Sequence, residues 1–97
     1  MSIARRIAEA DRRRAILAAL SISAAYTLPE RALRAQVEGI GYALSLDVLR
    51  ADIAWLAEIG LVERAEMDDV SLTDRGLDIV LGRAQVPGVR RPEPGEL

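Results

Sequence analysis

The chain has 97 residues, which is room for one small domain with a modest core. Apolar residues make up 51% of it and aromatic residues only 3%, a composition that predicts closely packed helices and excludes disorder. The net charge is -2, and the absence of Cys and His excludes disulfides, thiolate nucleophiles and zinc-finger sites.

Charge is unevenly distributed along the chain, and all thirteen basic residues are arginines. Residues 1–20 carry five arginines and two carboxylates. Residues 45–60 carry one arginine and three carboxylates, and residues 61–74 carry one arginine and five carboxylates. Two explanations for the arginines stay open: the codon usage of a GC-rich genome, or bidentate contacts to phosphate or carboxylate groups.

The lengths of the apolar segments bear on the cellular location of the protein. No apolar run approaches the ~20 residues that a membrane span needs. The basic start of the chain is not followed by the apolar stretch of a signal peptide. We therefore expect a cytoplasmic protein without a membrane partner.

The first predicted helix covers residues 2–21, with Ser2 as its N-cap. Its apolar side chains recur at near-helical spacing, namely Ile7, Ala10, Ile16, Leu17 and Leu20. The three arginines at residues 12–14 have two interpretations: phosphate contacts, or a solvated face paired with Glu9 and Asp11.

A second helix is predicted to open at Thr27. Thr27 and Glu30 have the spacing of a capping box, and Pro29 suits a first helical turn. Gly39 and Gly41 are placed to end the helix. A single buried stripe is expected at Leu33, Val37 and Ile40.

A third helix is predicted over residues 46–59, with Ser45 as N-cap and Gly60 as the residue that stops it. Two apolar rows run along it: Leu49, Ile53 and Leu56, and beside them Val48, Trp55 and Ile59. Trp55 is interpreted as a core anchor, the alternative being a surface on which a ligand stacks.

The pattern then changes to an approximate alternation, which predicts a short antiparallel hairpin over residues 61–72 that turns at Asp68 and Asp69. Thr73 would cap a last helix whose apolar positions are Leu77, Val80, Leu81 and Ala84. Gly76 inside this helix is expected to weaken it by roughly 1 kcal/mol. We expect one domain over residues 1–84 and an extended C-terminal tail over residues 85–97, mobile toward Leu97.

The order of these elements is that of a helix-turn-helix followed by a wing. The predicted fold class is therefore mainly α with a small β-hairpin, a winged helix-turn-helix.

Residues 52–62 resemble the junction between recognition helix and wing in many bacterial winged-helix regulators, and residues 72–76 resemble the end of their wing. A narrower resemblance is to a family of small ArsR-like proteins of Mu-like phages and prophages, and it is carried by residues 11–14, 55–58, 60–62, 75–78, 82–84 and 86–89. The resemblance implies a DNA-binding transcriptional regulator. The metal-sensing branch of the ArsR group uses Cys or His ligands, so its metal site is not carried over to this chain.

The candidate DNA-binding residues follow from how a helix-turn-helix enters the major groove with its second helix. Base-edge contacts are expected from the start of the third helix, and phosphate contacts from the second helix and the wing. The candidate residues are Ser45, Leu46, Asp47 and Arg50 for bases, and Arg31, Arg34 and Arg64 for phosphates.

Each of these assignments has an alternative. Arg50 is placed to pair with Asp47 or Asp52, and Arg34 with Glu38. Leu46 is equally suited to a protein interface. The acidic residues 66–69 at the wing tip are the feature least suited to DNA, because carboxylates repel phosphates.

Two functions are carried forward. The first is a phage or prophage DNA-binding regulator that acts as a homodimer, with Ile3 and Ile7 at the dimer interface. The second is a protein–protein interaction module that keeps the winged-helix shape but does not bind DNA. An enzyme is not expected, because no catalytic residues, cofactor site or metal site are indicated, and no small-molecule ligand is inferred.

Overall fold

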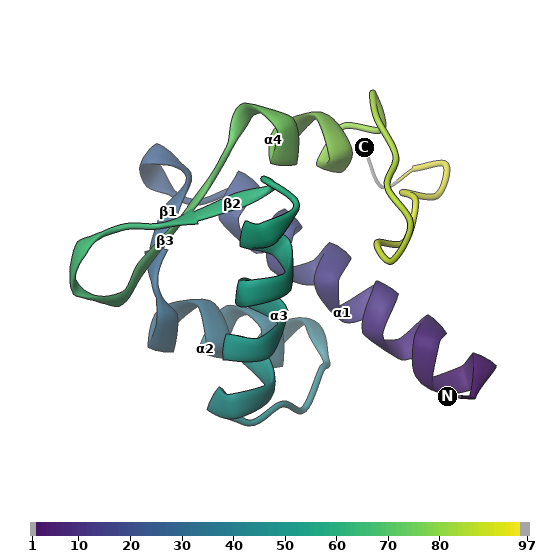
Figure 1. Cartoon of the computed structure of the whole chain (residues 1–97), viewed down its shortest axis with the longest axis horizontal. Helices are drawn as coiled ribbons and strands as arrows, with labels where there is room; N and C mark the ends of the chain where they lie inside the picture. The colour runs from purple at the N-terminus through teal and green to yellow at the C-terminus, as the bar shows by residue number, and fades with distance from the viewer. Residues whose placement is uncertain (1, 96–97) are drawn as a thin grey trace.

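The computed structural model describes residues 2–95, which form a mainly helical protein with a small antiparallel sheet (Figure 1). The α-helices are α1 (Ile3–Ser21), α2 (Glu30–Ile40), α3 (Leu46–Glu58) and α4 (Asp74–Val80). The strands are β1 (Thr27–Pro29), β2 (Val62–Arg64) and β3 (Asp69–Leu72). Two short 3-10 turns, Ala24–Tyr26 and Glu66–Asp68, precede β1 and β3. No helix in this part of the chain is long and apolar enough to cross a membrane.

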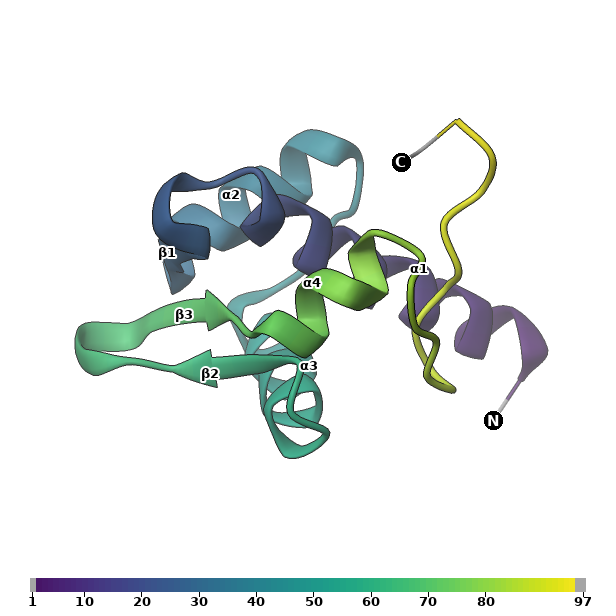
Figure 2. The ribbon, with the colours of Figure 1, turned by 90° about the horizontal axis from the view of Figure 1, so that it is seen from above.

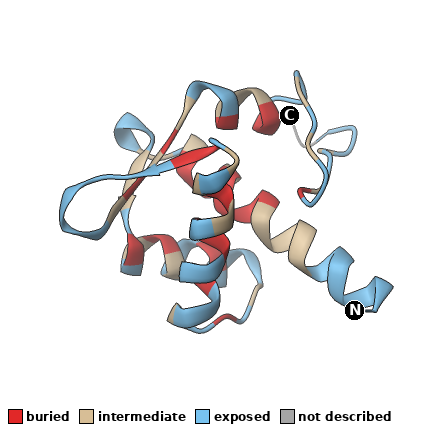
Figure 3. Cartoon of the chain, viewed as in Figure 1, coloured by how far each residue is buried: buried red, intermediate tan, exposed pale blue. Residues whose placement is uncertain are grey.

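Helix α1 has two halves with different surroundings. Ser2 caps it as predicted, accepting from the backbone N–H of Arg5 at 3.1 Å. Residues 14–20 are mostly buried and pack against α2 and α4, whereas residues 3–8 are exposed and project away from the domain (Figures 1 and 3). Ile7, one of the apolar residues at helical spacing, lies in this exposed half, and 56% of it is exposed. Its helical spacing is right, but the rest of the fold does not extend far enough to cover it.

The second helix begins at Glu30, three residues later than predicted. Thr27 is not a helix cap, because residues 27–29 pair with β3 as a third strand in the order β1-β3-β2. The Thr27 hydroxyl lies 2.8 Å from that of Ser71 across the two strands. Pro29 disfavours a helical conformation at Leu28 and tolerates the end of an edge strand, which explains the extended backbone.

Leu33 and Val37 on α2 are fully buried, as predicted, but Ile40 is 53% exposed. Ile40 is the last residue of the helix, and Gly41 ends it with a φ of +121°. The chain turns away at this point, so the predicted stripe is one residue longer than the core that it faces.

Helix α3 packs against β2 and α2. Ser45 caps it by accepting from the N–H of Val48 at 3.1 Å, as predicted. Leu49, Ile53 and Leu56 are fully buried, while the second predicted row is only partly covered and Val48 is 37% exposed. Gly60, with a φ of +81°, ends the helix region and directs Leu61 into the core.

The hairpin β2–β3 confirms the predicted change to strands, although its turn lies at Glu66–Asp68 and Asp69 already belongs to β3. Thr73 caps α4 by accepting from Gly76 N–H at 3.0 Å. The last helix is shorter than expected and ends at Val80. Leu81 is consequently 37% exposed, and Ile79, which the predicted stripe left out, is buried.

The C-terminal segment contains no helix or strand within residues 85–95, but it folds back along α1 (Figure 2). Val89 is buried, and the N–H of Arg90 donates to the carbonyl of Ala10 at 3.2 Å. Arg90 also pairs with Asp11 at 2.7 Å. The predicted mobility toward Leu97 lies outside the described residues, and the boundary after residue 84 stays a prediction.

Candidate functional site

The predicted DNA-binding residues come from α2, the first part of α3 with its N-cap, and β2. The structure brings two of them together on a carboxylate that the sequence analysis did not single out. Glu30, the first residue of α2, accepts from Arg50 Nε at 2.9 Å and Nη2 at 2.5 Å, and from Arg64 Nη1 at 3.3 Å. We call this group of three residues the Glu30 clamp. It ties α2, α3 and the hairpin to one another.

The Glu30 clamp is partly hidden from solvent. Only 4% of the Glu30 side chain is exposed, whereas Arg50 keeps 49% and Arg64 40% of their side-chain surface. The hydrogen bond from Arg50 lowers the pKa of Glu30 below its ordinary value, and the charges of Arg50 and Arg64 act in the same direction while burial opposes them. The same hydrogen bond raises the pKa of Arg50.

The lowered pKa of Glu30 makes the clamp a source of pH-dependent stability. A carboxylate whose pKa falls on folding stabilises the protein fully above the ordinary value of 4.5 and progressively less as the pH falls below it. We expect Glu30→Gln to lower the urea midpoint at pH 7 and to reduce the loss of stability between about pH 5 and about pH 2.

The exposed Glu38→Gln on the same helix is the control, and its urea midpoint is expected to follow the wild type across this range. Wild-type and Glu30→Gln midpoints that fall equally between about pH 5 and about pH 2 would show that the clamp is not a source of pH-dependent stability.

The remaining predicted phosphate contacts are on α2. Arg34 pairs with Glu38 at 3.5 Å, which is the predicted alternative to a phosphate contact. It also donates to the carbonyl of Leu44 at 3.1 Å. Arg31 is exposed and has no polar partner within residues 2–95. The alternative pairing of Arg50 with Asp47 or Asp52 is wrong, because Glu30 binds Arg50 and Asp52 faces α1.

Two of the predicted base contacts at the start of α3 already have a role in the fold. The Ser45 hydroxyl accepts the capping N–H, and Leu46 is partly buried against the core. Six residues of α3 are exposed, namely Asp47, Val48, Arg50, Ala51, Ala54 and Glu58, and four of them follow one line along the helix: Asp47, Ala51, Ala54 and Glu58. We call these four residues the outer stripe. The stripe itself offers two carboxylates and two methyl groups, and the hydrogen-bond donor beside it, Arg50, is held by Glu30.

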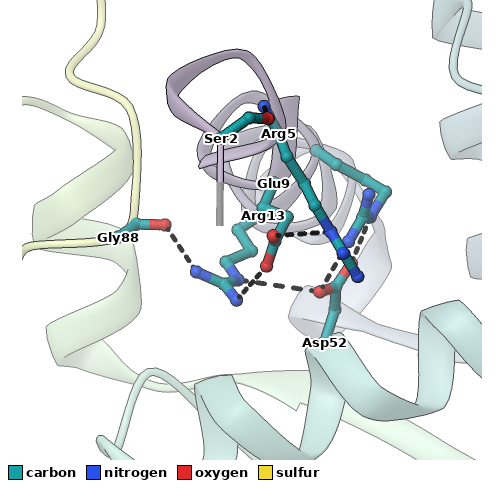
Figure 4. A network of polar contacts seen from close by, with 7 residues as sticks. Ser2, Arg5, Glu9, Arg13, Asp52 and Gly88 are labelled. Carbon is teal, nitrogen blue, oxygen red and sulfur yellow. Dashed lines mark hydrogen bonds and ion pairs between the residues drawn. The ribbon is translucent and has the colours of Figure 1, made fainter. Parts of the chain in front are cut away.

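A second buried carboxylate joins α3 to α1 (Figure 4). Asp52, whose side chain is 4% exposed, accepts from Arg12 Nε and from Arg12 Nη2, the latter at 3.0 Å. The hydrogen bond with Asp52 raises the pKa of Arg12, while burial opposes this shift. Arg13 Nε lies 3.6 Å from the same carboxylate.

Arg13 links three parts of the chain. Its guanidinium lies 4.0 Å from the centre of the Trp55 ring and donates to Glu9 at 3.2 Å and to the carbonyl of Gly88 in the C-terminal segment at 3.1 Å. Trp55 is only partly buried, so it anchors the α1–α3 contact instead of the centre of the core.

The interpretation of the three arginines as a solvated face paired with Glu9 and Asp11 is therefore wrong, apart from the pair between Arg13 and Glu9. Arg12 binds Asp52, and Arg14 is buried with 5% exposure.

An open apolar groove lies beside the projecting half of α1. Its volume is about 510 Å³, and its lining residues are Ile3, Arg6, Ile7, Glu9, Ala10, Arg13 and Gly88. We call it the arm groove, and residues 3–10 the arm. Ile3 and Ile7, the predicted dimer contacts, lie in it together and are 70% and 56% exposed. The dimer itself stays a prediction.

The chain matches no protein-family model and no solved structure. It is 43% identical over 68 residues to an uncharacterized protein of Escherichia phage Mu, gp26; the match covers 67% of this chain and 71% of the Mu protein. The chain belongs to the gp26 family. The predicted kinship with proteins of Mu-like phages is thereby confirmed at the level of this relative.

The residues that sequence reasoning missed in this gp26-family protein are its two buried acids. A signal for both was present. Glu30 lies three residues before the buried Leu33, and Asp52 lies three after Leu49 and four before Leu56, so helical periodicity places both carboxylates on the core-facing sides of their helices. A buried carboxylate requires a charged or hydrogen-bonding partner, and this chain has arginines as its only cationic side chains.

Proposed function

We propose that this member of the gp26 family is a protein–protein interaction module built on a winged helix-turn-helix arrangement, and that it does not read DNA through α3. The observation that carries the proposal is the outer stripe of α3. In a DNA-reading winged helix, this face would enter the major groove, where base edges are recognised mainly by side chains such as Arg, Lys, Asn and Gln.

The winged helix-turn-helix arrangement is supported by the order of the elements. Helices α2 and α3 are joined by a short turn that contains Gly41, and the hairpin β2–β3 follows directly. This arrangement fixes which side of α3 faces outward, and hence which residues a DNA duplex would meet.

The charges around α3 support protein contacts. Phosphate contacts from Arg and Lys supply most non-specific DNA affinity. Of the four arginines on these elements that were predicted to contact bases or phosphates, three already have carboxylate partners within the fold: Arg34, Arg50 and Arg64. The hairpin turn adds exposed carboxylates at Glu66 and Asp68. The arginines on these elements are therefore largely offset by carboxylates, and the charge of Asp68 also acts on Arg50.

A second candidate function is the dimeric DNA-binding regulator, and one observation favours it. Arg31 has no polar partner within residues 2–95, and Arg50 and Arg64 keep about half of their side-chain surface exposed beside it on the Glu30 clamp. These three guanidinium groups are the positions from which a phosphate backbone would be held, with the outer stripe left uninvolved.

The deciding experiment is a fluorescence-anisotropy titration of a random 20-base-pair duplex at several salt concentrations. We expect no measurable binding at 50 mM salt. Three phosphate contacts would instead give measurable binding. A plot of the logarithm of the binding constant against the logarithm of the salt concentration would then have a slope of about -2.7, because each contact contributes about -0.9. That result would overturn the interaction-module proposal in favour of the regulator.

A positive control is the double variant Asp47→Arg with Glu58→Arg, which replaces both carboxylates of the outer stripe. Since both residues are exposed, the fold is expected to persist. The variant is expected to gain salt-dependent binding to the same duplex, which shows that the assay detects phosphate contacts from this face.

A further inference from the structure

We propose that copies of this protein associate head to tail, the hairpin turn of one copy occupying the arm groove of the next. The proposal rests on the proposed function and names its partner as a second copy of the chain. Two features that nothing else in the fold uses carry it: the arm groove and the exposed apolar residue at the hairpin turn.

The arm groove is apolar at its floor and basic at its edge. Ile3, Ile7 and Ala10 supply the floor from α1. Arg6 lines the groove, is exposed and has no polar partner within residues 2–95. Arg5 follows on the neighbouring side of the arm with 73% of its side chain exposed.

One carboxylate, Glu9, also lines the groove, and its charge is opposed within the copy that carries it. Arg13 lies 3.2 Å from one Glu9 oxygen, and Arg5 lies 3.7 Å from the other. Arg13 is itself shared with Asp52. The charge left at the edge of the groove is therefore that of Arg6, a cation without a carboxylate partner among the described residues.

The hairpin turn has the complementary character. Met67 is 91% exposed, the largest exposure among the big apolar residues of the described chain. Glu66 and Asp68 flank it, and both are exposed. Methionine is flexible and adapts to irregular apolar surfaces, so its side chain suits the arm groove while the two carboxylates face Arg5 and Arg6. We call residues 66–68 the tip.

The positions of the tip and the arm require two copies. They lie at opposite ends of the molecule, whose longest dimension is 35 Å (Figure 1). A copy therefore does not fill its own groove. A contact between unlike surfaces repeats from copy to copy and generates a ring or an open chain, whereas a symmetric pair of arms would stop at a dimer.

The contact is small, since it involves one turn and one helical arm. Standard protein–protein interfaces bury about 1,600 Å². We therefore expect association that depends on protein concentration and that weakens with salt, because charges of opposite sign meet at its edge.

The experiment uses two variants of the full chain. The tip variant carries Glu66→Gln, Met67→Asn and Asp68→Asn, and asparagine suits the positive φ of residues 67 and 68. The groove variant carries Ile3→Gln and Ile7→Gln, two exposed positions where a helix-forming residue preserves α1. Circular dichroism melting confirms that both variants are folded.

Analytical ultracentrifugation is then run over a 100-fold range of concentration. We expect the mass of the wild type to rise with concentration and each variant alone to stay a monomer. An equimolar mixture of the two variants retains one intact tip and one intact groove per pair, so it is expected to form a heterodimer and nothing larger.

Two results would overturn the proposal: a wild type that stays monomeric throughout, or a tip variant that associates as the wild type does. The second result would indicate that arms pair with arms. Neither result bears on DNA, so the duplex titration tests the proposed function separately. A charge exchange provides a further check. The Arg6→Glu variant is expected not to bind the tip of the wild-type protein, and it is expected to associate again when it is mixed with the Asp68→Lys variant.

Discussion

Replacing Gly76 by Ala is expected to destabilise the protein by about 1–3 kcal/mol, although alanine is the better helix former. A Cβ at this position would lie 2.2 Å from the carbonyl oxygen of Leu61 and 2.6 Å from Cδ1 of Leu72. The Leu61 carbonyl is held in place, because it accepts the N–H of Thr73 at 3.1 Å. The added methyl group would therefore push α4 away from the hairpin.

The matched control is Gly39→Ala on α2. No atom lies within 4 Å of a Cβ built at Gly39, so this substitution gains helix propensity without a collision. We expect it to stabilise the protein by about 0.4–1 kcal/mol. Urea unfolding followed by circular dichroism measures both changes. If both substitutions changed the free energy of unfolding in the same direction, the close approach of α4 to Leu61 would be contradicted.

Asp52→Asn is expected to cost about 3 kcal/mol of unfolding free energy, the lower part of the range for breaking a buried ion pair. The change leaves Arg12, whose side chain is 19% exposed, without its hydrogen-bonded carboxylate, and leaves Arg13, 14% exposed, with Glu9 as its remaining carboxylate partner. Because these contacts join α1 to α3, the loss is expected to loosen the arm as well. Broadened NMR signals from residues 3–13 in the variant would report this.

Asp47→Asn is the control on the same helix. Asp47 is exposed in the first turn of α3, where a negative charge contributes only about 0.3–1 kcal/mol through the helix dipole. Chemical denaturation of both variants at pH 7 compares the buried and the exposed carboxylate. Similar losses from Asp47→Asn and Asp52→Asn would show that Asp52 is not the link between α1 and α3.

The parts of this fold that the sequence predicts well are those set by neighbouring residues. Ser45 and Thr73 cap the helices that follow them, and Gly60 ends α3, because each of these signals acts within a few residues. The strand at residues 27–29 was missed because its partner, β3, lies more than forty residues away. Only the position of Pro29 hinted at an extended backbone.

The candidate site was predictable in its residues but not in its pairings. Helical periodicity places Glu30 on a buried face, yet it does not specify which arginine binds it. Arg50 comes from α3 and Arg64 from β2, so the Glu30 clamp depends on the packing of three elements. Arg50 and Arg64, each of which suits a contact with DNA when considered alone, thus connect α3 and β2 to α2 through Glu30.

The measurement that tests the central claim most directly is a ¹H–¹⁵N NMR titration of the wild-type protein with a short duplex at low salt. If the outer stripe does not read DNA, the amide signals of Asp47, Ala51 and Ala54 stay unchanged up to an excess of duplex. Saturable shifts confined to these residues and to Arg50 would contradict the account and identify α3 as a recognition helix.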